Sequence, residues 1–158
     1  MKVLAIKTSG DHTSISVILN DEVNTFSMSH ERKDRPDWNF FLANIGHKRT
    51  FSLKDIDLFA FANSQDSYTA TRTVASYLKG IAVALTKPLM AIEDKDDKSF
   101  EADMVAKIAK ENFLAADKNY NQFDPNNANP SYTEETTFKK LDELLTFKFF
   151  SWISSRAN

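Results

Sequence analysis

The stretch IDLFAFANSQDSYTATR (residues 56–72) joins the two patterns that decide the fold of this chain. Residues 56–62 are almost continuously apolar, which is typical of a strand covered on both faces of a sheet. From residue 67 onward, apolar side chains recur at helical spacing up to Leu85, and Lys87 and Pro88 end the pattern. A covered strand followed by a helix is the repeating unit of α/β proteins, so we predict an α/β fold.

The junction between this strand and this helix contains no glycine. In α/β proteins a phosphate often binds at such a junction, on a glycine-rich loop that opens a helix. The whole chain has only Gly10, Gly46 and Gly80, whereas average usage of about 7% would give roughly 11 glycines. A loop that wraps a phosphate needs backbone conformations that glycine adopts most readily. We therefore expect this junction to orient the helix rather than to bind a phosphate.

The remaining patterns extend the strand and helix into a complete lobe. Turn-forming GDH and NDE separate three strand patterns at the N-terminus, which predicts an antiparallel meander. The predicted strands are residues 3–9, 13–20, 23–29, 56–62 and 88–93, and the predicted helices are residues 36–45, 67–85 and 104–114. A meander followed by crossover units gives a mixed five-stranded sheet with helices on its faces. This is the ribonuclease H-like core of the actin-like ATPases.

The C-terminal part is predicted to be less regular. Residues 118–135 are rich in asparagine and contain proline, which favours a loop. Residues 137–158 carry an amphipathic helical pattern, which would dock on the sheet or meet a partner. We divide the chain into a ribonuclease H-like lobe, residues 1–93, and a linker, helix, loop and C-terminal helix, residues 94–158, as the remnant of a second lobe.

Composition narrows the function classes. A chain of 158 residues fits one ordinary domain. Its formal charge of −2 gives no global attraction to nucleic acid. The absence of cysteine excludes disulfides and thiolate chemistry. No segment has the pattern of a signal peptide or a membrane span, so we expect a cytoplasmic protein without membrane contact.

Three stretches carry a resemblance to a known family. MKVLAIKTSGDHTSISVILND (residues 1–21) is similar to a first strand that commonly reads ILAIDTS and continues into a serine-containing second strand. DLFAFANSQDSYTATRTVASYLKGIAVALTKPLMAI (residues 57–92) is similar to the block AVGRGPGSFTGLRIG…AKGLA…PLVGV. NPSYTEETTFKK (residues 129–140) resembles a C-terminal PVYLR…KK. These motifs belong, in this order, to the TsaB family, also called YeaZ, which this chain therefore resembles.

The resemblance implies a non-catalytic scaffold subunit. TsaB proteins belong to the actin-like superfamily and help to make threonylcarbamoyladenosine in tRNA by pairing with the catalytic subunit TsaD, assisted by the ATPase TsaE. Two helices of the N-terminal lobe form the pairing surface, which can also support a homodimer. They correspond here to residues 36–45 and 67–85. Contact with tRNA is then indirect, and no cofactor is expected.

Side chains on these two helices are the candidate partner-binding residues. Trp38, Phe40 and Phe41 are near neighbours, and a helix cannot bury all three against one core face. Large apolar groups at a surface commonly mark an interface. On the second helix, a stripe of small residues with Arg72 would let another helix approach and would accept a carboxylate. Simple core packing is the alternative for both helices. The candidates are Trp38, Phe41, Leu42, Ile45, Tyr68, Thr71, Arg72, Ala75 and Lys79.

The chain also departs from the family pattern. Lys7 stands where the family has the aspartate of DTS, close to the metal and phosphates in active relatives, and an ammonium there would oppose a magnesium ion. Ser64, Gln65 and Asp66 replace GPG, and Ala70 replaces the glycine of SFTG. The second lobe is largely missing, because a helix and the C-terminal motif follow the fifth strand almost directly.

Three sets of polar residues have both a functional interpretation and a solvated one. A lysine and hydroxyls after a strand can contact a phosphate, but we favour a solvated strand end for Lys7, Thr8 and Ser9. Histidines without ligand spacing are predicted to lie at the surface, namely His12, His30 and His47. An acidic run interleaved with lysines is predicted to be a solvated linker rather than a cation site, and comprises Glu93, Asp94, Asp96 and Asp97.

No serine lies in a nucleophile-elbow setting, and no pair of carboxylates can be shown to converge. We therefore expect no catalysis, no metal and no bound cofactor. Our hypothesis is a scaffold for a TsaD-type subunit in tRNA threonylcarbamoylation. The alternatives are a small actin-like-superfamily nucleotide-binding domain, and a diverged homodimer without a tRNA role.

Overall fold

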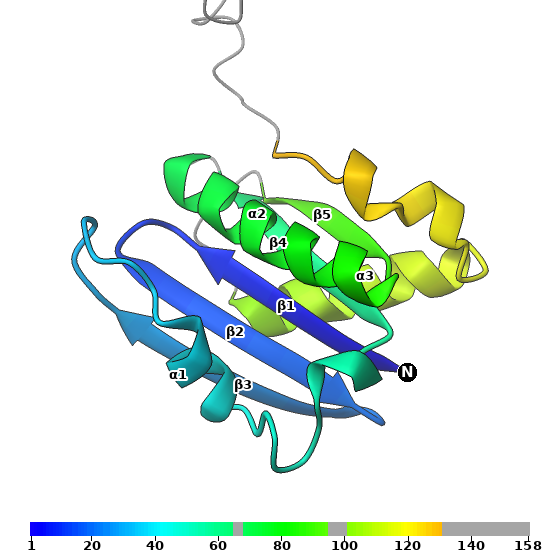
Figure 1. Ribbon diagram of the computed structural model, residues 1–158, viewed down its shortest axis with the longest axis horizontal. Helices are drawn as coiled ribbons and strands as arrows, with labels where there is room; N and C mark the ends of the chain where they lie inside the picture. Colours follow the sequence, from blue (N-terminus) through cyan, green and yellow to red (C-terminus); the bar gives the residue numbers. More distant parts are fainter. Residues whose placement is uncertain (65–67, 95–100, 131–158) are drawn as a thin grey trace, which may run out of the picture.

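A single mixed sheet with helices on both faces forms the body of the protein (Figure 1). The computed structural model describes residues 1–64, 68–94 and 101–130. The strands are β1 (Lys2–Thr8), β2 (His12–Leu19), β3 (Glu22–Ser29), β4 (Leu58–Ser64) and β5 (Leu89–Asp94). The α-helices are α1 (Trp38–Ala43), α2 (Tyr68–Leu85) and α3 (Ala102–Ala115). Short 3₁₀ turns are η1 (Leu53–Asp55), η2 (Tyr120–Phe123) and η3 (Pro125–Asn127).

The strand order is β3-β2-β1-β4-β5. The first three strands are antiparallel neighbours, whereas β4 and β5 run parallel to β1. The predicted meander and crossover units are therefore confirmed, and the sheet is that of a ribonuclease H-like, actin-like lobe. The carboxyl ends of the three parallel strands meet at one edge of this sheet, which is where α/β proteins usually bind their ligands.

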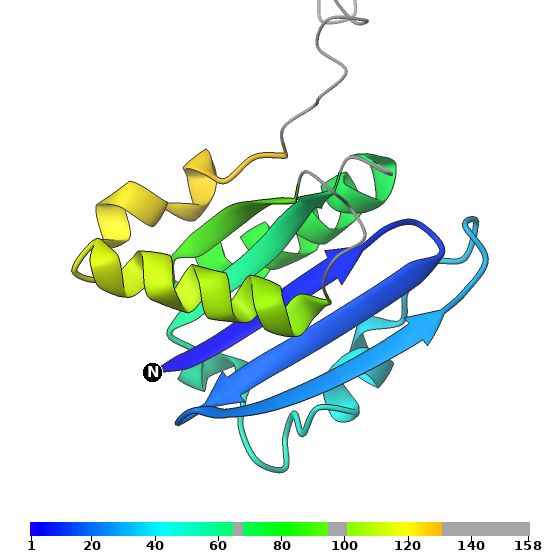
Figure 2. The same cartoon turned by 180° about the vertical axis from the view of Figure 1, so that it is seen from behind.

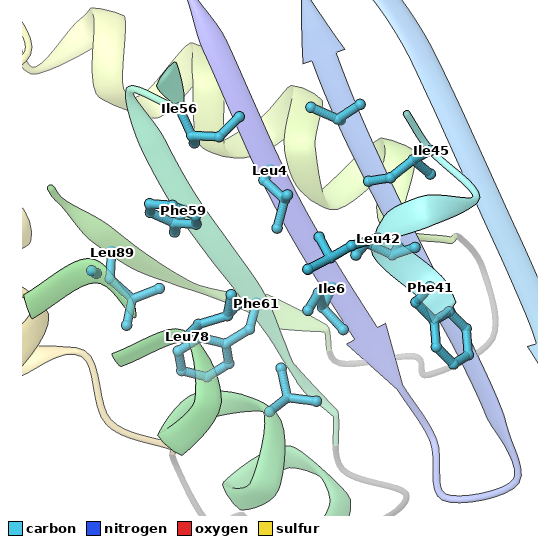
Figure 3. Packing of buried hydrophobic residues seen from close by; sticks show 14 of the residues in the cluster. Leu4, Ile6, Phe41, Leu42, Ile45, Ile56, Phe59, Phe61, Leu78 and Leu89 are labelled. Atoms are coloured by element: carbon cyan, nitrogen blue, oxygen red, sulfur yellow. The ribbon is translucent and has the colours of Figure 1, made fainter. Parts of the chain in front are cut away.

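Helices α1 and α2 cover one face of the sheet, as Figure 1 shows from the front. The core on this face combines alternate residues of the central strands with one side of each helix (Figure 3). Fully buried members include Leu4, Ile6, Phe41, Phe59 and Leu78. We call this face of the sheet, with its two helices, the α1/α2 face.

Helix α3 covers the opposite face, seen in front of the sheet in Figure 2. The strand residues between those of the first face point this way, and they pack on the alanine-rich side of α3. The members of this second core include Val3, Ala5, Ala60, Val105 and Ala106. Small residues on both sides let the helix lie close to the strands. We call this the α3 face.

Helix α1 is shorter than the residues 36–45 that we predicted. It begins at Trp38 because the Asp37 side chain caps it, accepting a hydrogen bond from the Phe40 backbone N–H at 3.2 Å. It ends before Gly46, whose φ of +105° favours glycine and whose missing side chain would collide with Thr50 Oγ1. The other predicted strands and helices differ from the structure only at their ends.

Beyond α3, the chain turns back over the β5 edge and reaches the α1/α2 face. In Figure 1 this segment runs from the end of α3, in yellow, to residue 130, in orange. Ala128 joins the core under α2, and Lys79 of α2 hydrogen-bonds to Asn129 at 2.8 Å. The predicted helix in residues 137–158, with its docking site, lies outside the described residues. None of the described helices is long and apolar enough to cross a membrane.

Candidate functional site

Lys7 lies at the carboxyl end of β1 and is buried rather than solvated. Its side chain is 8% exposed, and its ammonium forms an ion pair with Oδ2 of Asp94, the last residue of β5, at 2.5 Å. β4 separates these two strands, so the pair spans the end of the sheet. The prediction of a solvated strand end was wrong for Lys7, because its partner comes from a distant strand, and also for Thr8, which is 4% exposed and lies 2.9 Å from Thr13 Oγ1. The cation is already matched by a carboxylate of the same chain.

The acidic run predicted to be a solvated linker begins two residues too early, because Glu93 and Asp94 belong to β5. Asp94 is 2% exposed and belongs to β5, so it is a structural residue. The neighbouring Glu93 accepts a hydrogen bond from Asn63 Nδ2 at 2.8 Å, which ties β5 to β4. Asp96 and Asp97 lie outside the described residues. In the part of the chain that the structure describes, no cluster of three metal-ligating side chains occurs.

The N-terminus of α3 is held by polar side chains of β2 and β3. Ser14 Oγ accepts the buried backbone N–H of Ala102 at 3.0 Å and a hydrogen bond from Ser27 at 3.2 Å. Glu101 Oε2 is an alternative acceptor for the single Ser27 hydroxyl proton, also at 3.2 Å. Glu101, the residue before the helix, makes no side-chain cap of its own. Ser14 therefore provides the capping interaction from another strand.

His12 and His30 both have specific partners at this end of the sheet. His12 Nε2 lies 3.1 Å from Glu101 Oε1 on the α3 side. His30 Nε2 lies 2.8 Å from Thr13 Oγ1, which is 2.9 Å from Thr8 Oγ1. Both residues are partly exposed, as predicted for surface histidines, and each has a specific partner. Their positions fix the ends of three strands relative to one another.

The α1/α2 face presents a different set of side chains. Trp38 of α1 stacks on Tyr77 of α2, with ring centroids 4.9 Å apart. Burial of Tyr77 disfavours its phenolate and raises the pKa of its hydroxyl. Phe40 is 46% exposed and touches Phe26 of β3 edge to face. Phe41, its neighbour, is fully buried. One helix thus sends one phenylalanine to the core and leaves one at the surface.

Five of the nine predicted partner-binding residues are core residues in this structure. Their side chains are at most 3% exposed, so a partner cannot reach them while the lobe is folded. These residues are Phe41, Leu42, Ile45, Thr71 and Ala75. Trp38 and Lys79 are partly exposed and Arg72 is exposed, whereas the side chain of Tyr68 lies outside the described residues. Among the described side chains, the predicted contact set therefore narrows to Trp38, Arg72 and Lys79.

The chain itself covers the stripe that we assigned to a partner on α2. Lys79 bonds to Asn129, and a small pocket beside α2 is lined by Asn129, Pro130, Arg72, Ala75, Ser76 and Lys79. Nothing in the local pattern of α2 could reveal this contact, because the covering segment lies far along the chain. Among the described side chains of the predicted stripe, Arg72 is the exposed one.

Three further exposed residues of α2, which sequence reasoning missed, lie in line with Arg72. We define the α2 stripe as Arg72, Ser76, Gly80 and Val83, all exposed and spaced by three or four residues. Val83 is 48% exposed, and a Cβ added at Gly80 would meet nothing within 4 Å. The signal available in the sequence was the recurrence of small residues at this spacing. It could not be separated from the neighbouring stripe without the three-dimensional structure.

Comparisons with known proteins identify the fold. A structure of YeaZ from Pseudomonas aeruginosa is similar with a TM-score of 0.54 and 20% sequence identity, over 59% of this chain and 44% of that chain. The same scores and coverage of this chain hold for an uncharacterized protein with similarity to peptidase YEAZ from Pseudomonas aeruginosa, of which 43% is covered. This chain therefore matches less than half the length of either protein.

At this level of identity the likeness establishes a shared fold, and it agrees with the resemblance found in the sequence motifs. No family model matches the sequence. No protein in the curated set is similar to it either.

Proposed function

We propose that this protein is a TsaB-like, non-catalytic scaffold that pairs through its α1/α2 face with a TsaD-type subunit in tRNA threonylcarbamoylation. The exposed α2 stripe is the observation that carries this proposal. The fold shared with YeaZ and the sequence motifs supply the family context. In this proposal the protein acts in the cytoplasm, a TsaE-type ATPase assists the pair, and tRNA contact is indirect.

The α2 stripe has the shape that helix pairing requires. Ser76 and Gly80 keep the surface low, and the space above Gly80 is open, so the backbone of a second helix can approach closely. Val83 and Phe40 supply exposed apolar area on the same side of the sheet. Apolar residues exposed beside small ones are typical of a surface that becomes covered on association.

Arg72 adds a charge to this surface. It is exposed, and it forms no ion pair with any described residue. A guanidinium binds a carboxylate through two parallel hydrogen bonds, which gives direction as well as attraction. A partner helix with an acidic residue opposite Arg72 would therefore be oriented along α2.

The nucleotide-binding alternative receives less support. The Lys7 ammonium occupies the carboxyl end of β1 and pairs with Asp94. A magnesium ion at this position would have to compete with the ammonium for the Asp94 carboxylate. The homodimer alternative uses the same surface as our proposal, and the experiment below separates the two.

The test is co-purification of the full chain with the TsaD-type subunit from the same cell, using Gly80→Arg as the disrupting variant. The free lobe tolerates this change, because nothing lies near the new side chain and arginine is a better helix former than glycine. A partner helix over Gly80 would collide with it. Met104→Arg is the matched control, since Met104 is an exposed residue of α3 on the opposite face.

We expect Gly80→Arg to abolish pairing and Met104→Arg to leave it intact, with both variants as stable to urea as the parent chain. Pairing that survives Gly80→Arg would refute the assigned surface. Sedimentation of the chain alone identifies a homodimer. If Gly80→Arg dissociates that homodimer and the parent chain does not capture the TsaD-type subunit, the alternative without a tRNA role would be favoured. Calorimetric binding of Mg-ATP at micromolar concentration would favour the nucleotide-binding alternative.

A further inference from the structure

A cavity of about 700 Å³ opens at the carboxyl end of the sheet, on the α1/α2 face. Three segments surround it: the β1–β2 hairpin with Thr8 and Gly10, the segment between β3 and α1, and the first turns of α2. They lie together at the left of Figure 1. Trp38 provides an aromatic wall. The volume falls within the range of small-molecule sites, roughly 300–1,000 Å³.

The segment between β3 and α1 carries acids and bases, and its charged residues that line the cavity are Arg32, Lys33, Asp34 and Arg35. Asp34 accepts the Glu31 N–H at 3.2 Å, and Asp37 caps α1. Lys33 pairs with Glu31 at 3.8 Å. Neither arginine has an ion-pair partner among the described residues. The cavity therefore has two guanidinium groups whose hydrogen-bond donors remain available.

The floor of the cavity is held in place by a chain of hydrogen bonds. His30 Nδ1 lies 2.9 Å from the Glu31 carbonyl oxygen, which only accepts, so Nδ1 carries a proton. Nε2 of the same ring lies 2.8 Å from Thr13 Oγ1, which lies 2.9 Å from Thr8 Oγ1. These contacts join the β1–β2 hairpin to the start of the segment that carries Arg32 and Arg35, and so hold this side of the cavity in position.

This cavity is separate from the Lys7–Asp94 pair. Lys7 has the same parity along β1 as Val3 and Ala5, which face α3, whereas Thr8 belongs to the opposite face. A ligand in the cavity would thus meet Thr8 and the arginines, and it would not compete with Asp94 for the lysine.

We propose that this cavity binds the phosphate group of a small phosphorylated molecule without a metal ion. Arginine pairs are suited to a phosphate dianion, because each guanidinium donates two parallel hydrogen bonds to it. The volume exceeds that of a phosphate alone, so the rest of the ligand has room beside Trp38. The site is independent of pairing through the α2 stripe.

Trp38 allows a direct test by fluorescence. The only other tryptophan is Trp152, so the full chain with Trp152→Phe reports the cavity alone. The probes are phenyl phosphate, inorganic phosphate and benzoate, at constant ionic strength and with EDTA. The disrupting variant is Arg32→Gln with Arg35→Gln. The matched control is Lys54→Gln with Lys107→Gln, which removes the same charge from exposed positions outside the cavity.

We expect saturable binding of phenyl phosphate that EDTA does not change, and weaker binding of inorganic phosphate and of benzoate. The arginine variant should weaken phenyl phosphate binding by about tenfold or more, because two charged donors are lost, and the lysine variant should leave it unchanged. No saturation up to about 10 mM, equal losses in the two variants, or equal binding of benzoate would each overturn the proposal. Partner capture by the arginine variant should remain normal, which keeps this test distinct from that of the α2 stripe.

Discussion

The two faces of the sheet end in opposite ways at the same edge. On the α3 face, the carboxyl end is closed by groups that satisfy one another: Lys7 with Asp94, and Ser14 with the first amide of α3. On the α1/α2 face, the same edge leaves a cavity with unpaired arginines, and α2 exposes a surface with open space above Gly80. On the α3 face the named polar groups have partners within the chain, whereas the α1/α2 face has arginines and exposed side chains that could bind a ligand or a partner.

This difference shows which residues a functional hypothesis can use. A buried group with a partner contributes to the folded state, and changing it affects stability first. An exposed group without a partner contributes little to folding, so it can be selected for binding. Two predictions test the α3 face and a third concerns a histidine near α1, in order from the largest expected effect to the smallest.

The buried ion pair should dominate the stability of the α3 face. Asp94→Leu would leave the Lys7 ammonium buried without its carboxylate, and we expect a loss of about 3–5 kcal/mol in the free energy of unfolding. The double variant Lys7→Met with Asp94→Leu removes both charges and should recover most of that loss. Urea unfolding of the full chain measures both quantities. A double variant as unstable as Asp94→Leu would mean that the pair does not close this face.

Sequence reasoning located the strands and helices well, because the hydrophobic periodicity of each element lies within its own segment of the sequence. The apolar run of β4, the turn chemistry between the first strands and the spacing in α2 all lie within single segments. The burial of Lys7, in contrast, could not be predicted from the local sequence. Its environment depends on Asp94, which the fold brings across the end of β4. A lysine at a strand end has no local pattern that distinguishes burial from exposure.

The candidate site was harder to predict for a related reason. Ala75 and Lys79 were plausible contact residues until η3 and Asn129 were seen to cover that side of α2. Likewise, the arginines between β3 and α1 looked like part of a balanced charge run in the sequence. Only the folded segment shows that Asp34 and Asp37 bond to the backbone, that Glu31 pairs with Lys33, and that the two arginines line a cavity without an ion pair to any described residue.

The capping role of Ser14 gives the next prediction. Ser14→Ala removes the acceptor of the buried Ala102 N–H, and we expect a loss of about 1–2 kcal/mol in unfolding free energy. Ser16→Ala is the control, because Ser16 is equally buried but bonds to Asn24 and Thr25 on the exposed β3 strand, where water can replace it. Equal losses in urea unfolding would show that Ser14 has no special role at α3.

The smallest predicted effect concerns His47, which follows α1 on the α1/α2 face. Its ring is partly buried against Phe51, with centroids 5.6 Å apart, and no hydrogen bond to it occurs within the described ranges. Desolvation, reinforced by the charge of Lys48, lowers the pKa of His47 below its ordinary value of 6.5. The unfolded chain therefore binds this proton more readily than the folded one.

The sign of the pH dependence follows directly. As the pH falls through 6.5, the unfolded state gains a proton at His47 that the folded state resists, so stability decreases until the pH lies below the folded-state pKa. His47→Gln should remove this contribution, and between about pH 7.5 and 5.5 it should lose less unfolding free energy than the parent chain. Parallel pH profiles would contradict the desolvation of His47. In that case the His47 ring would not be desolvated in the folded protein. The difference between the α1/α2 face and the α3 face would then depend on the cavity and the α2 stripe alone.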